Sequence, residues 1–494
     1  MNSVFEENGF EAFLVGGAVR DLIRGKPASD WDVATNATPD DVIRIFKRVI
    51  PTGISHGTVT VHFMKEEIEV TTYRLEKDYS DGRHPDSVTY AADIEEDLSR
   101  RDFTMNAIAA SLKDGSLVDP FGGQEDIKAH IIRTVGDADQ RFSEDGLRPV
   151  RAIRFAAQTG FDITSETLAA IPRARQVTAK ISIERFRDEF VKLISSDAPS
   201  KGLRLMEETG ILEQFLPEIA SCRGVIQADE RGHHQFDVLD HMLYALDGAA
   251  WLERQRGSAF SDNTGSDTGL SSKVNLEVRL AALFHDIGKP STRRVDHAQL
   301  AGAPEGIMAE IYTFFGHENK GASITKSVLS RLRFPNSVIQ YVSHLVKQHM
   351  FHYESTWTDA AIRRFIMRAT PEETTSGASG AHSFEEALND LFDVRICDVC
   401  GMSGTPALLS EGPWKDNLLE LRSRIESIRS EAAAFSLKDL AVKGKDLMEA
   451  GIAPGKQLGL ILGELLDAVV EDPTCNTRDA LIPLALNLYK TLNR

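Results

Sequence analysis

The chain has 494 residues, a formal net charge of −18 at pH 7 and four cysteines. That length exceeds one hydrophobic core and predicts about three or four domains. The charge argues against a protein that coats nucleic acid by bulk attraction. No apolar run approaches the roughly 18 residues of a membrane span, and the acidic N-terminus does not resemble a signal peptide. With few cysteines, the sequence predicts a cytoplasmic protein that makes no membrane contact.

The first informative stretch combines a strand, a turn and a helix. An apolar run predicts a strand over residues 12–15, two glycines turn the chain, and helical periodicity covers 18–23. Free backbone N–H groups at the start of such a helix can bind phosphate. Asp30 and Asp32 follow, and on a strand both project to one face, where carboxylates suit Mg²⁺ with substrate phosphates as further ligands. The order predicts metal-assisted nucleotidyl transfer, although each piece alone also fits an ordinary turn.

The next β-rich runs predict a hairpin. Residues 57–63 and 68–74 read as strands joined by a polar turn at 65–67. Glu69 alternates with apolar neighbours, so it either adds a third carboxylate to the face of the two aspartates or faces solvent. The polar stretch 77–85 then predicts a surface loop.

Residues 100–107, RRDFTMNA, form the most specific string in the chain. With the head pattern they resemble the class II tRNA nucleotidyltransferases, the CCA-adding enzymes, and the related poly(A) polymerases of the DNA polymerase β-like superfamily. The resemblance implies that Arg101 contacts the sugar and phosphates of a bound nucleotide, a task that suits a guanidinium fork. It further implies that Gly17 and Arg20 hold phosphates, that the two aspartates hold Mg²⁺, and that the loop at 77–85 takes part in switching from C to A.

From residue 136 the pattern becomes helical. Asp145, Arg148, Arg151 and Arg154 recur every third residue and are predicted to share a helical face that is free to meet a ligand. An Asp accepts from an exocyclic amine while an Arg donates to a ring acceptor, and C and A both offer that edge whereas U and G present a carbonyl. We therefore predict that Asp145 and Arg148 choose the base and that Arg151 and Arg154 continue along the triphosphate.

Two spacings in this helical part also resemble the family. The Glu-Asp-x-x-Arg spacing that contains Asp145 is similar to that of the CCA-adding enzymes and differs by one residue from that of the poly(A) polymerases. Residues 184–189, ERFRDE, are similar to a further family motif. Arg185 and Glu189 stand at i,i+4, so we predict a helix ion pair that supports the base-selecting helix.

A second constellation of histidines and aspartates lies further along. His285 and Asp286 stand in HDIGK after an apolar helical run, with His241 upstream and Asp398 downstream. Adjacent His and Asp can bind one cation whose ligand sphere distant His and Asp complete. The order resembles the HD phosphohydrolase superfamily and implies a second divalent metal on these four residues. Other nearby candidates are His317 and His349, as ligands of a further ion, and His233, His234, Asp237 and His344. The alternative is a helical domain with ordinary core histidines.

The predicted fold is α+β: a polymerase β-like nucleotidyltransferase head with a small mixed sheet, followed by a long all-helical part that includes an HD-type helical domain. Cys397 and Cys400 resemble half of a zinc site, but with no second pair we predict two thiols on a helical face. Residues 257–273 and 371–383 are predicted surface loops. The predicted domains are the head at 1–135, the base-selecting neck at 136–220, the HD-type domain at 221–405 and a helical tail at 406–494, which by resemblance holds the tRNA elbow.

The predicted function is template-independent addition of C, C and A to the 3′ end of tRNA from CTP and ATP, dependent on Mg²⁺. Three rivals remain open at this point. A poly(A) polymerase uses ATP alone, and a partial enzyme adds only CC or only A. The third alternative is an HD phosphohydrolase, in which the head only binds nucleotide and the HD domain carries the activity. The sequence leaves the oligomeric state open.

Overall fold

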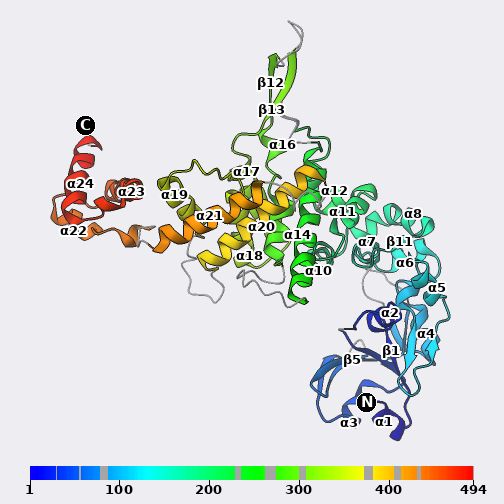
Figure 1. The fold of residues 1–494 in the computed structure, drawn as a ribbon. Helices are drawn as coiled ribbons and strands as arrows, with labels where there is room; N and C mark the ends of the chain where they lie inside the picture. Colours follow the sequence, from blue (N-terminus) through cyan, green and yellow to red (C-terminus); the bar gives the residue numbers. More distant parts are fainter. Residues whose placement is uncertain are drawn as a thin grey trace. The chain divides into compact units, whose positions relative to one another are not determined.

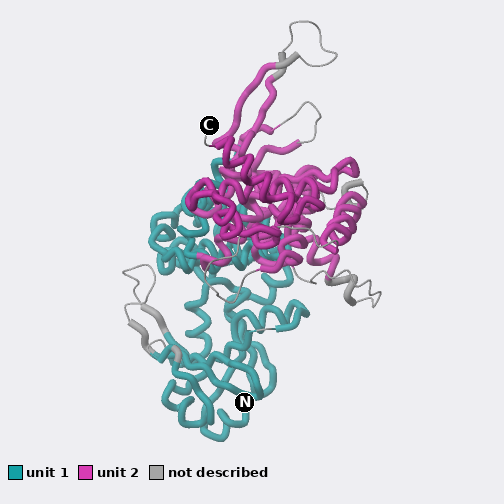
Figure 2. The backbone as a smooth tube through the Cα atoms, turned by 90° about the vertical axis from the view of Figure 1, so that its left-hand side faces the viewer, with its two compact units in different colours: residues 1–223, 328–333 teal, residues 224–327, 334–494 magenta. Residues whose placement is uncertain are grey.

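The computed structural model describes residues 1–28, 30–54, 57–77, 87–227, 235–261, 274–299, 308–371, 382–404, 413–430 and 436–492. The chain divides into two compact units, one of residues 1–223 with 328–333 and the other of residues 224–327 with 334–494 (Figure 2). Most of the predicted loop at 77–85 and both His233 and His234 lie outside the described residues. Within the described residues, no helix combines the length and the apolar character needed to cross a membrane.

The first unit begins with a seven-stranded mixed sheet in the order β3-β4-β5-β2-β1-β8-β9. β2 and β5 run parallel, and the other neighbours pair antiparallel. The strands are β1 (Ala12–Val15), β2 (Asp32–Thr35), β3 (Val49–Gly53), β4 (Thr58–Phe63), β5 (Glu66–Thr72), β8 (Ala109–Ser111) and β9 (Leu117–Val118). The small mixed sheet predicted for the head is confirmed.

Alternation along β2 decides which side of the sheet carries the site. Val33 belongs to a core cluster with Phe5 and Val42, on α1 (Asn2–Glu7) and α3 (Pro39–Ile45). Ala34 belongs to the opposite cluster with Leu98, on α4 (Ile94–Ser99). Successive strand residues face opposite sides, so Asp32, two residues before Ala34, faces the α4 side.

The predicted strand at 12–15 and the helix after it are confirmed, the helix being α2 (Gly17–Ile23). The predicted hairpin is also present as β4 and β5, but the predicted turn at 65–67 is displaced. Met64 and Lys65 both have positive φ and form the two-residue connection, as right-handed strand twist favours in tight hairpins. A second hairpin pairs β6 (Arg74–Lys77) with β7 (Ser87–Tyr90).

The rest of the first unit is mostly helical. α7 (Arg148–Thr159) is its central helix, with nine of its twelve residues buried and Gly160 in the left-handed conformation at its end. Around it lie a short parallel pair of β10 (Ile131–Ile132) with β11 (Asp162–Ile163) and the helices α5 (Gly123–Lys128), α6 (Ala138–Glu144), α8 (Ser165–Arg173), α9 (Arg175–Thr178), α10 (Ile183–Ile194), α11 (Pro199–Glu208), α12 (Ile211–Phe215) and α13 (Pro217–Ala220).

The second unit is built from helices. Its described helices are α14 (Val238–Ser261), α15 (Leu276–Phe284), α16 (Lys289–Thr292), α17 (His317–Arg331, whose last turn is grouped with the first unit), α18 (Asn336–Gln348), α19 (Asp359–Ala369), α20 (Phe384–Ser403), α21 (Pro413–Ser430), α22 (Gly444–Glu449), α23 (Lys456–Glu471) and α24 (Arg478–Leu492). The last three share a separate core. A hairpin that the sequence did not predict, β12 (Arg294–Gln299) with β13 (Met308–Thr313), extends from this helical body (Figure 1).

Candidate nucleotidyl-transfer and metal sites

Asp32 stands at the start of β2, directly beside Glu69 on the parallel strand β5. Asp30 lies before the strand and is exposed, so only Asp32 occupies the strand position predicted for both. Burial, Glu69 and Asp30 raise the pKa of Asp32, and Arg101 opposes them. Glu69 is exposed to solvent, as one alternative predicted. Its charge nevertheless helps to raise the pKa of Asp32, so it also lies near the carboxylate face of the other alternative. Among the described residues, these three acids do not form a group with ligand atoms all within 4.8 Å.

Gly16 stands at the meeting point of three elements. Its φ of +72° lies in the region that favours glycine. A Cβ atom added to Gly16 would lie 3.3 Å from Nη1 of Arg101 and 3.4 Å from Oδ2 of Asp32. The glycine turn, the β2 carboxylate and the arginine that follows α4 therefore border one small space, and only a residue without a side chain leaves it open.

Arg101 is anchored through one end of its guanidinium. Its Nη2 donates to Oδ2 of Asp97 at 3.2 Å. Its Nε is buried with no hydrogen-bond partner in the described part of the chain. A buried N–H without a partner is costly, and this one remains open to a further hydrogen-bond acceptor.

Arg20 is already engaged by protein groups. Its Nε and Nη2 donate to the two oxygens of Asp21 at 3.0 and 2.9 Å, and its Nη1 donates to Asn106 at 3.0 Å. Its guanidinium also lies 5.1 Å from the ring centre of Phe155 on α7. Arg20 thus links the start of the glycine-turn helix to the RRDFTMNA segment and to the neck helix.

The predicted base-reading pair lies at the junction of α6 and α7. Asp145 follows α6, and its Oδ2 accepts from Nη2 of Arg185 at 2.8 Å while its Oδ1 accepts from the backbone N–H of Leu147 at 3.0 Å. Arg148 is buried, pairs with Glu144 and donates from Nη2 to the backbone oxygen of Arg100 at 3.1 Å. Both side chains are held in place, but by other residues rather than by each other.

The glycine between them has a steric role. A Cβ on Gly146 would lie 2.5 Å from the backbone oxygen of Val177. The turn that carries Asp145 can therefore pack against α9 only with glycine at this position.

The other two arginines of α7 are paired with acids, so the predicted free basic face is wrong. Nε of Arg151 donates to Oδ2 of Asp102 at 2.8 Å. Nε of Arg154 donates to Oε2 of Glu189 at 2.8 Å, and its side chain is only 8% exposed. Burial lowers the pKa of Arg154 to about 10 although Glu189 opposes the shift. Burial likewise disfavours the charge of Asp102, but Arg151 and Asn106 outweigh it and lower its pKa to about 2.

The predicted ion pair within α10 is wrong as well. Arg185 reaches Asp145 and Glu189 reaches Arg154, so the two residues of the ERFRDE segment bond outward to two different points of the neck. The expectation that α10 supports the base-selecting helix is met in this other way. Sequence reasoning missed Asp97 and Asp102 as partners of arginines and gave Glu189 the wrong partner, although each is an acid within or near a motif rich in arginine.

A tight cluster of metal-ligand residues lies in the second unit. Oδ2 of Asp286 lies 3.2 Å from Nε2 of His241 and 3.3 Å from Nε2 of His285, and Oδ1 of Asp398 lies 3.2 Å from Nε2 of His241. Oδ1 of Asp286 faces the other way, 3.3 Å from Nε2 of His317 and 3.8 Å from Nε2 of His349. The two histidine pairs thus flank a single buried carboxylate. The structure brings together all four residues predicted for this site.

Backbone contacts aim three of these histidines at the carboxylate. Nδ1 of His285, His317 and His349 lies 2.7 to 2.8 Å from the backbone oxygen three residues earlier. Such a bond places the proton on Nδ1 and leaves Nε2 as the ligand atom, as in metal sites generally. Asp237 instead caps the start of α14, and His344 bonds to the backbone of Ala369, so neither belongs to the cluster.

Burial and neighbouring charges set the protonation of the cluster. Burial disfavours a charge on His285, but Asp286 and Asp398 outweigh it and raise its pKa to about 10. Burial, and after it the positive charge of His285, lowers the pKa of His349 to about 3. Lys289 and His285 overcome burial and hold the pKa of Asp286 well below its ordinary value.

Two glycines allow this cluster to assemble. A Cβ on Gly401 of α20 would lie 2.8 Å from the ring of His241, and a Cβ on Gly288 would lie 2.2 Å from the backbone oxygen of His317. Cys397 and Cys400, also on α20, are buried free thiols, which agrees with their prediction as helical-face thiols.

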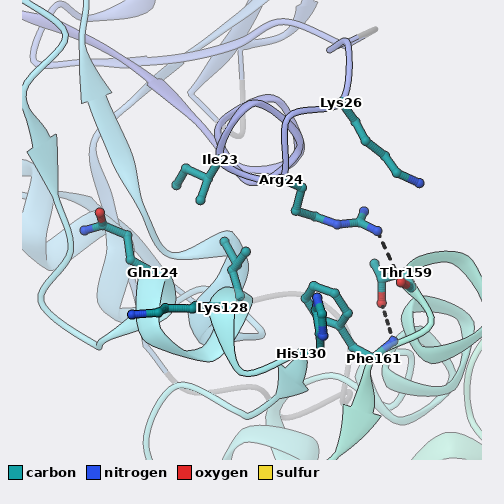
Figure 3. Close-up of a pocket in the computed structure, with 9 residues that line it drawn as sticks. Ile23, Arg24, Lys26, Gln124, Lys128, His130, Thr159 and Phe161 are labelled. Atoms are coloured by element: carbon teal, nitrogen blue, oxygen red, sulfur yellow. Dashed lines mark hydrogen bonds between the residues drawn. The ribbon is translucent and has the colours of Figure 1, made fainter.

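A pocket of about 420 Å³ in the first unit lies away from these residues, between the ends of α2 and α5 (Figure 3). Its basic side chains include Arg24, Lys26 and Lys128. Arg24 donates to the backbone oxygen of Thr159, the last residue of α7. Cations near helix C-termini complement the partial negative charge there, so local electrostatics account for this basic rim.

Models of known families match most of the described parts. The Poly A polymerase head domain matches residues 12–133, and the probable RNA and SrmB-binding site of polymerase A matches 160–223. The HD domain matches 238–392, and the putative tRNA nucleotidyltransferase domain 2 matches 416–485. The fold and these matches define a polymerase-type nucleotidyltransferase that also carries an HD domain.

Comparison with individual proteins identifies the family more narrowly than the domain matches do. The CCA-adding enzyme of Levilactobacillus brevis is 33% identical over 483 residues, which cover 97% of this chain and 94% of that protein. The chain belongs to the family of CCA-adding enzymes. The CCA-adding enzyme of Geobacillus thermodenitrificans is 50% identical over 213 residues, or 43% of this chain, and the match spans only 52% of that relative.

Solved structures agree with the fold. The Bacillus stearothermophilus CCA-adding enzyme in complex with CTP has a TM-score of 0.65 and 28% identity, with 100% of this chain and 96% of that chain covered. The Thermotoga maritima CCA-adding enzyme complexed with tRNA has a TM-score of 0.50 and 18% identity, over 99% of this chain and 93% of that chain. At that identity the second likeness concerns the fold alone.

Proposed function

We propose that this protein adds C, C and A to the 3′ end of tRNA from CTP and ATP without a nucleic-acid template. The observation that carries the proposal is the convergence of Asp32, Gly16 and Arg101 on one small space. A carboxylate for a cation, a glycine turn that opens a helix and a guanidinium with one unpartnered N–H are parts suited to transfer of a nucleotide from a triphosphate. Membership of the CCA-adding family supplies the choice of tRNA as the acceptor.

Asp30 and Asp32 are the proposed ligands of Mg²⁺. The donor type suits a hard cation, because these are carboxylates; burial, Glu69 and Asp30 raise the pKa of Asp32, and a bound cation would relieve the like-charge part of that shift. A bound Mg²⁺ supplies charge neutralisation at the α-phosphate and the leaving pyrophosphate. Arg101 then binds the sugar and phosphates, and the N–H of Gly17, with Arg20 behind it, borders the phosphates at the start of α2.

Base choice is assigned to Asp145 and Arg148. Asp145 accepts from the exocyclic amine of C or A and Arg148 donates to the adjacent ring acceptor. Arg185 and Glu144 hold the two side chains before a nucleotide arrives, so little ordering is needed on binding. Arg151, bonded to Asp102, and Arg154, bonded to Glu189, are assigned to the support of α7 rather than to the triphosphate.

One assay tests the proposal against its rivals. tRNA lacking its last three nucleotides is incubated with labelled CTP and ATP, separately and together. We expect two additions with CTP alone and three with both. Long products from ATP alone indicate a poly(A) polymerase, and an arrest after CC or an exclusive addition of A indicates a partial enzyme. Asp32→Ala should abolish every addition.

A second activity is proposed for the HD domain on the strength of its buried ligand cluster. His241, His285, Asp286 and Asp398 would hold one divalent cation, and His317 and His349 would share Asp286 with another. The proposed chemistry is hydrolysis of a phosphoester by a cation-activated water. His285→Ala should remove bound metal and any hydrolysis while CCA addition continues, and an unchanged metal content would contradict the assignment.

The remaining assignments follow from the same function. The helical tail that begins at 406 is proposed to hold the tRNA elbow, and its own core of α22, α23 and α24 fits a separate binding element. The four free cysteines agree with a reducing compartment, and we place the protein in the cytoplasm.

A further inference from the structure

Asp97 on α4 is a carboxylate with an unusually complete set of donors. Its side chain is 1% exposed. Oδ1 accepts from Nε and Nη2 of Arg100 at 3.0 and 2.8 Å and from the backbone N–H of Arg74 at 3.3 Å. Oδ2 accepts from Nη2 of Arg101 at 3.2 Å. Both arginines of the RRDFTMNA segment therefore bond to the same buried acid.

The acid is held in its charged form. Burial disfavours the carboxylate, but Arg100 and Arg101 outweigh that effect and hold the pKa of Asp97 below its ordinary value. A buried charge persists only when it is paired and hydrogen-bonded. Asp97 is consequently a fixed anion beneath the two arginines at neutral pH.

The bond to Asp97 uses only one nitrogen of the Arg101 guanidinium and leaves the others available. Asp97 takes Nη2, while Nη1 lies at the space bordered by Gly16 and Asp32, and Nε has no partner in the described structure. A guanidinium is planar and rigid, so holding one corner fixes where the other donors point. Asp32 also attracts this guanidinium, and the bond to Asp97 holds its other end.

We propose that Asp97 is the positioning residue that directs Arg101 toward the sugar and phosphates of the incoming nucleotide, an inference that rests on the proposed role of Arg101. Asp97 also accepts a hydrogen bond from the backbone N–H of Arg74, the first residue of β6. One side chain therefore holds both the start of this hairpin and the guanidinium of Arg101. Because it acts on groups that CTP and ATP share, it influences the affinity for both nucleotides equally and leaves base choice to Asp145 and Arg148.

The test compares two conservative substitutions in the full-length protein. Asp97→Asn keeps the shape and one acceptor but removes the charge. Asp126→Asn is the matched control, because Asp126 is another buried head acid, bonded to Arg133 and Thr104 and to neither residue of the Arg100–Arg101 pair. Steady-state rates with CTP, with ATP and with tRNA give KM and kcat for each variant, and thermal unfolding shows whether each one folds.

We expect Asp97→Asn to raise the KM for CTP and for ATP together, by about tenfold, as the loss of one charge-assisted contact predicts. The KM for tRNA and the selection of C and A over U and G should not change. Asp126→Asn should lower the melting temperature to a similar degree without altering either nucleotide KM. A rise in KM that is equal in the two variants would overturn the proposal, because it would reduce Asp97 to a general structural role.

A double-mutant cycle separates this inference from the function on which it rests. In an Arg101→Ala background, Asp97→Asn should add little further loss, because the residue acts through that arginine. Additive losses would refute the positioning role alone. An Arg101→Ala variant with unchanged nucleotide KM would instead refute the proposed contact of Arg101 itself.

Discussion

Nη2 of Arg185 donates to Oδ2 of Asp145 at 2.8 Å, across 40 residues of sequence. The bond ties the proposed base reader to α10, so a distant charge and the local N–H of Leu147 together orient Asp145. Arg185 also has a buried Nη1 with no hydrogen-bond partner among the described residues. The Arg185–Asp145 pair therefore keeps one N–H donor, on Nη1 of Arg185, that a further acceptor could bond near the junction of α6 and α7.

Releasing Asp145 should relax base choice. We expect Arg185→Met to raise misincorporation of U and G by roughly tenfold or more, because one oriented hydrogen-bonding pair contributes about 1–3 kcal/mol to discrimination. Single-turnover addition with each of the four nucleoside triphosphates measures the effect. Arg187→Met is the control, since Arg187 lies on the same helix but pairs with Asp188. Unchanged selectivity in Arg185→Met would contradict the reader assignment.

A methyl group at Gly16 should obstruct the nucleotide site. Gly16→Ala brings a Cβ to 3.3 Å from Arg101 and 3.4 Å from Asp32 and imposes strain at a φ of +72°. Gly25→Ala, near the other end of α2, also replaces a glycine of positive φ, +71°, but with nothing within 4 Å. We expect both variants to lose about 1–2 kcal/mol of stability and only Gly16→Ala to lose nucleotide addition. Calorimetry and the addition assay should separate the two effects, and equal activities would argue against a site at this turn.

Acid should weaken the link between the head and the neck helix through Asp102. Its pKa is lowered to about 2, so its stabilising contribution is complete above the ordinary carboxyl value and is lost as the pH falls toward 2. At pH 7 the shift corresponds to roughly 2 kcal/mol. Asp102→Asn should therefore lower the melting temperature at pH 7 and flatten its decline between pH 4 and pH 2. A variant with the wild-type decline would show that other groups govern acid unfolding.

The metal cluster of the HD domain should depend on a glycine outside the HDIGK string. Gly401→Ala places a Cβ 2.8 Å from the ring of His241, so we expect bound divalent metal to fall by tenfold or more, as for other residues that orient metal ligands. Gly248→Ala, which crowds Cys400 in the same pair of helices, is the matched control and should retain metal. Metal analysis after dialysis reports the difference, and CCA addition should continue in both variants.

The sequence by itself determined several local elements and many of the residues that the two sites contain. Local patterns were sufficient for β1, α2 and the hairpin of β4 and β5, because apolar alternation and glycine act over a few residues. The order His241, His285-Asp286, Asp398 anticipated a real cluster, because the structure brings all four side chains together. The RRDFTMNA string identified the arginine that borders the carboxylate of Asp32.

Only the tertiary structure decided which charges meet. Spacing placed Arg151 and Arg154 on an open face, whereas long-range packing pairs them with Asp102 and Glu189. The i,i+4 rule paired Arg185 with Glu189, whereas each bonds a different neck residue. The physical reason is that an ion pair depends on distance and dielectric, which are properties of the packed chain. A sequence records which residues carry charge, and folding selects their partners and removes the water between them.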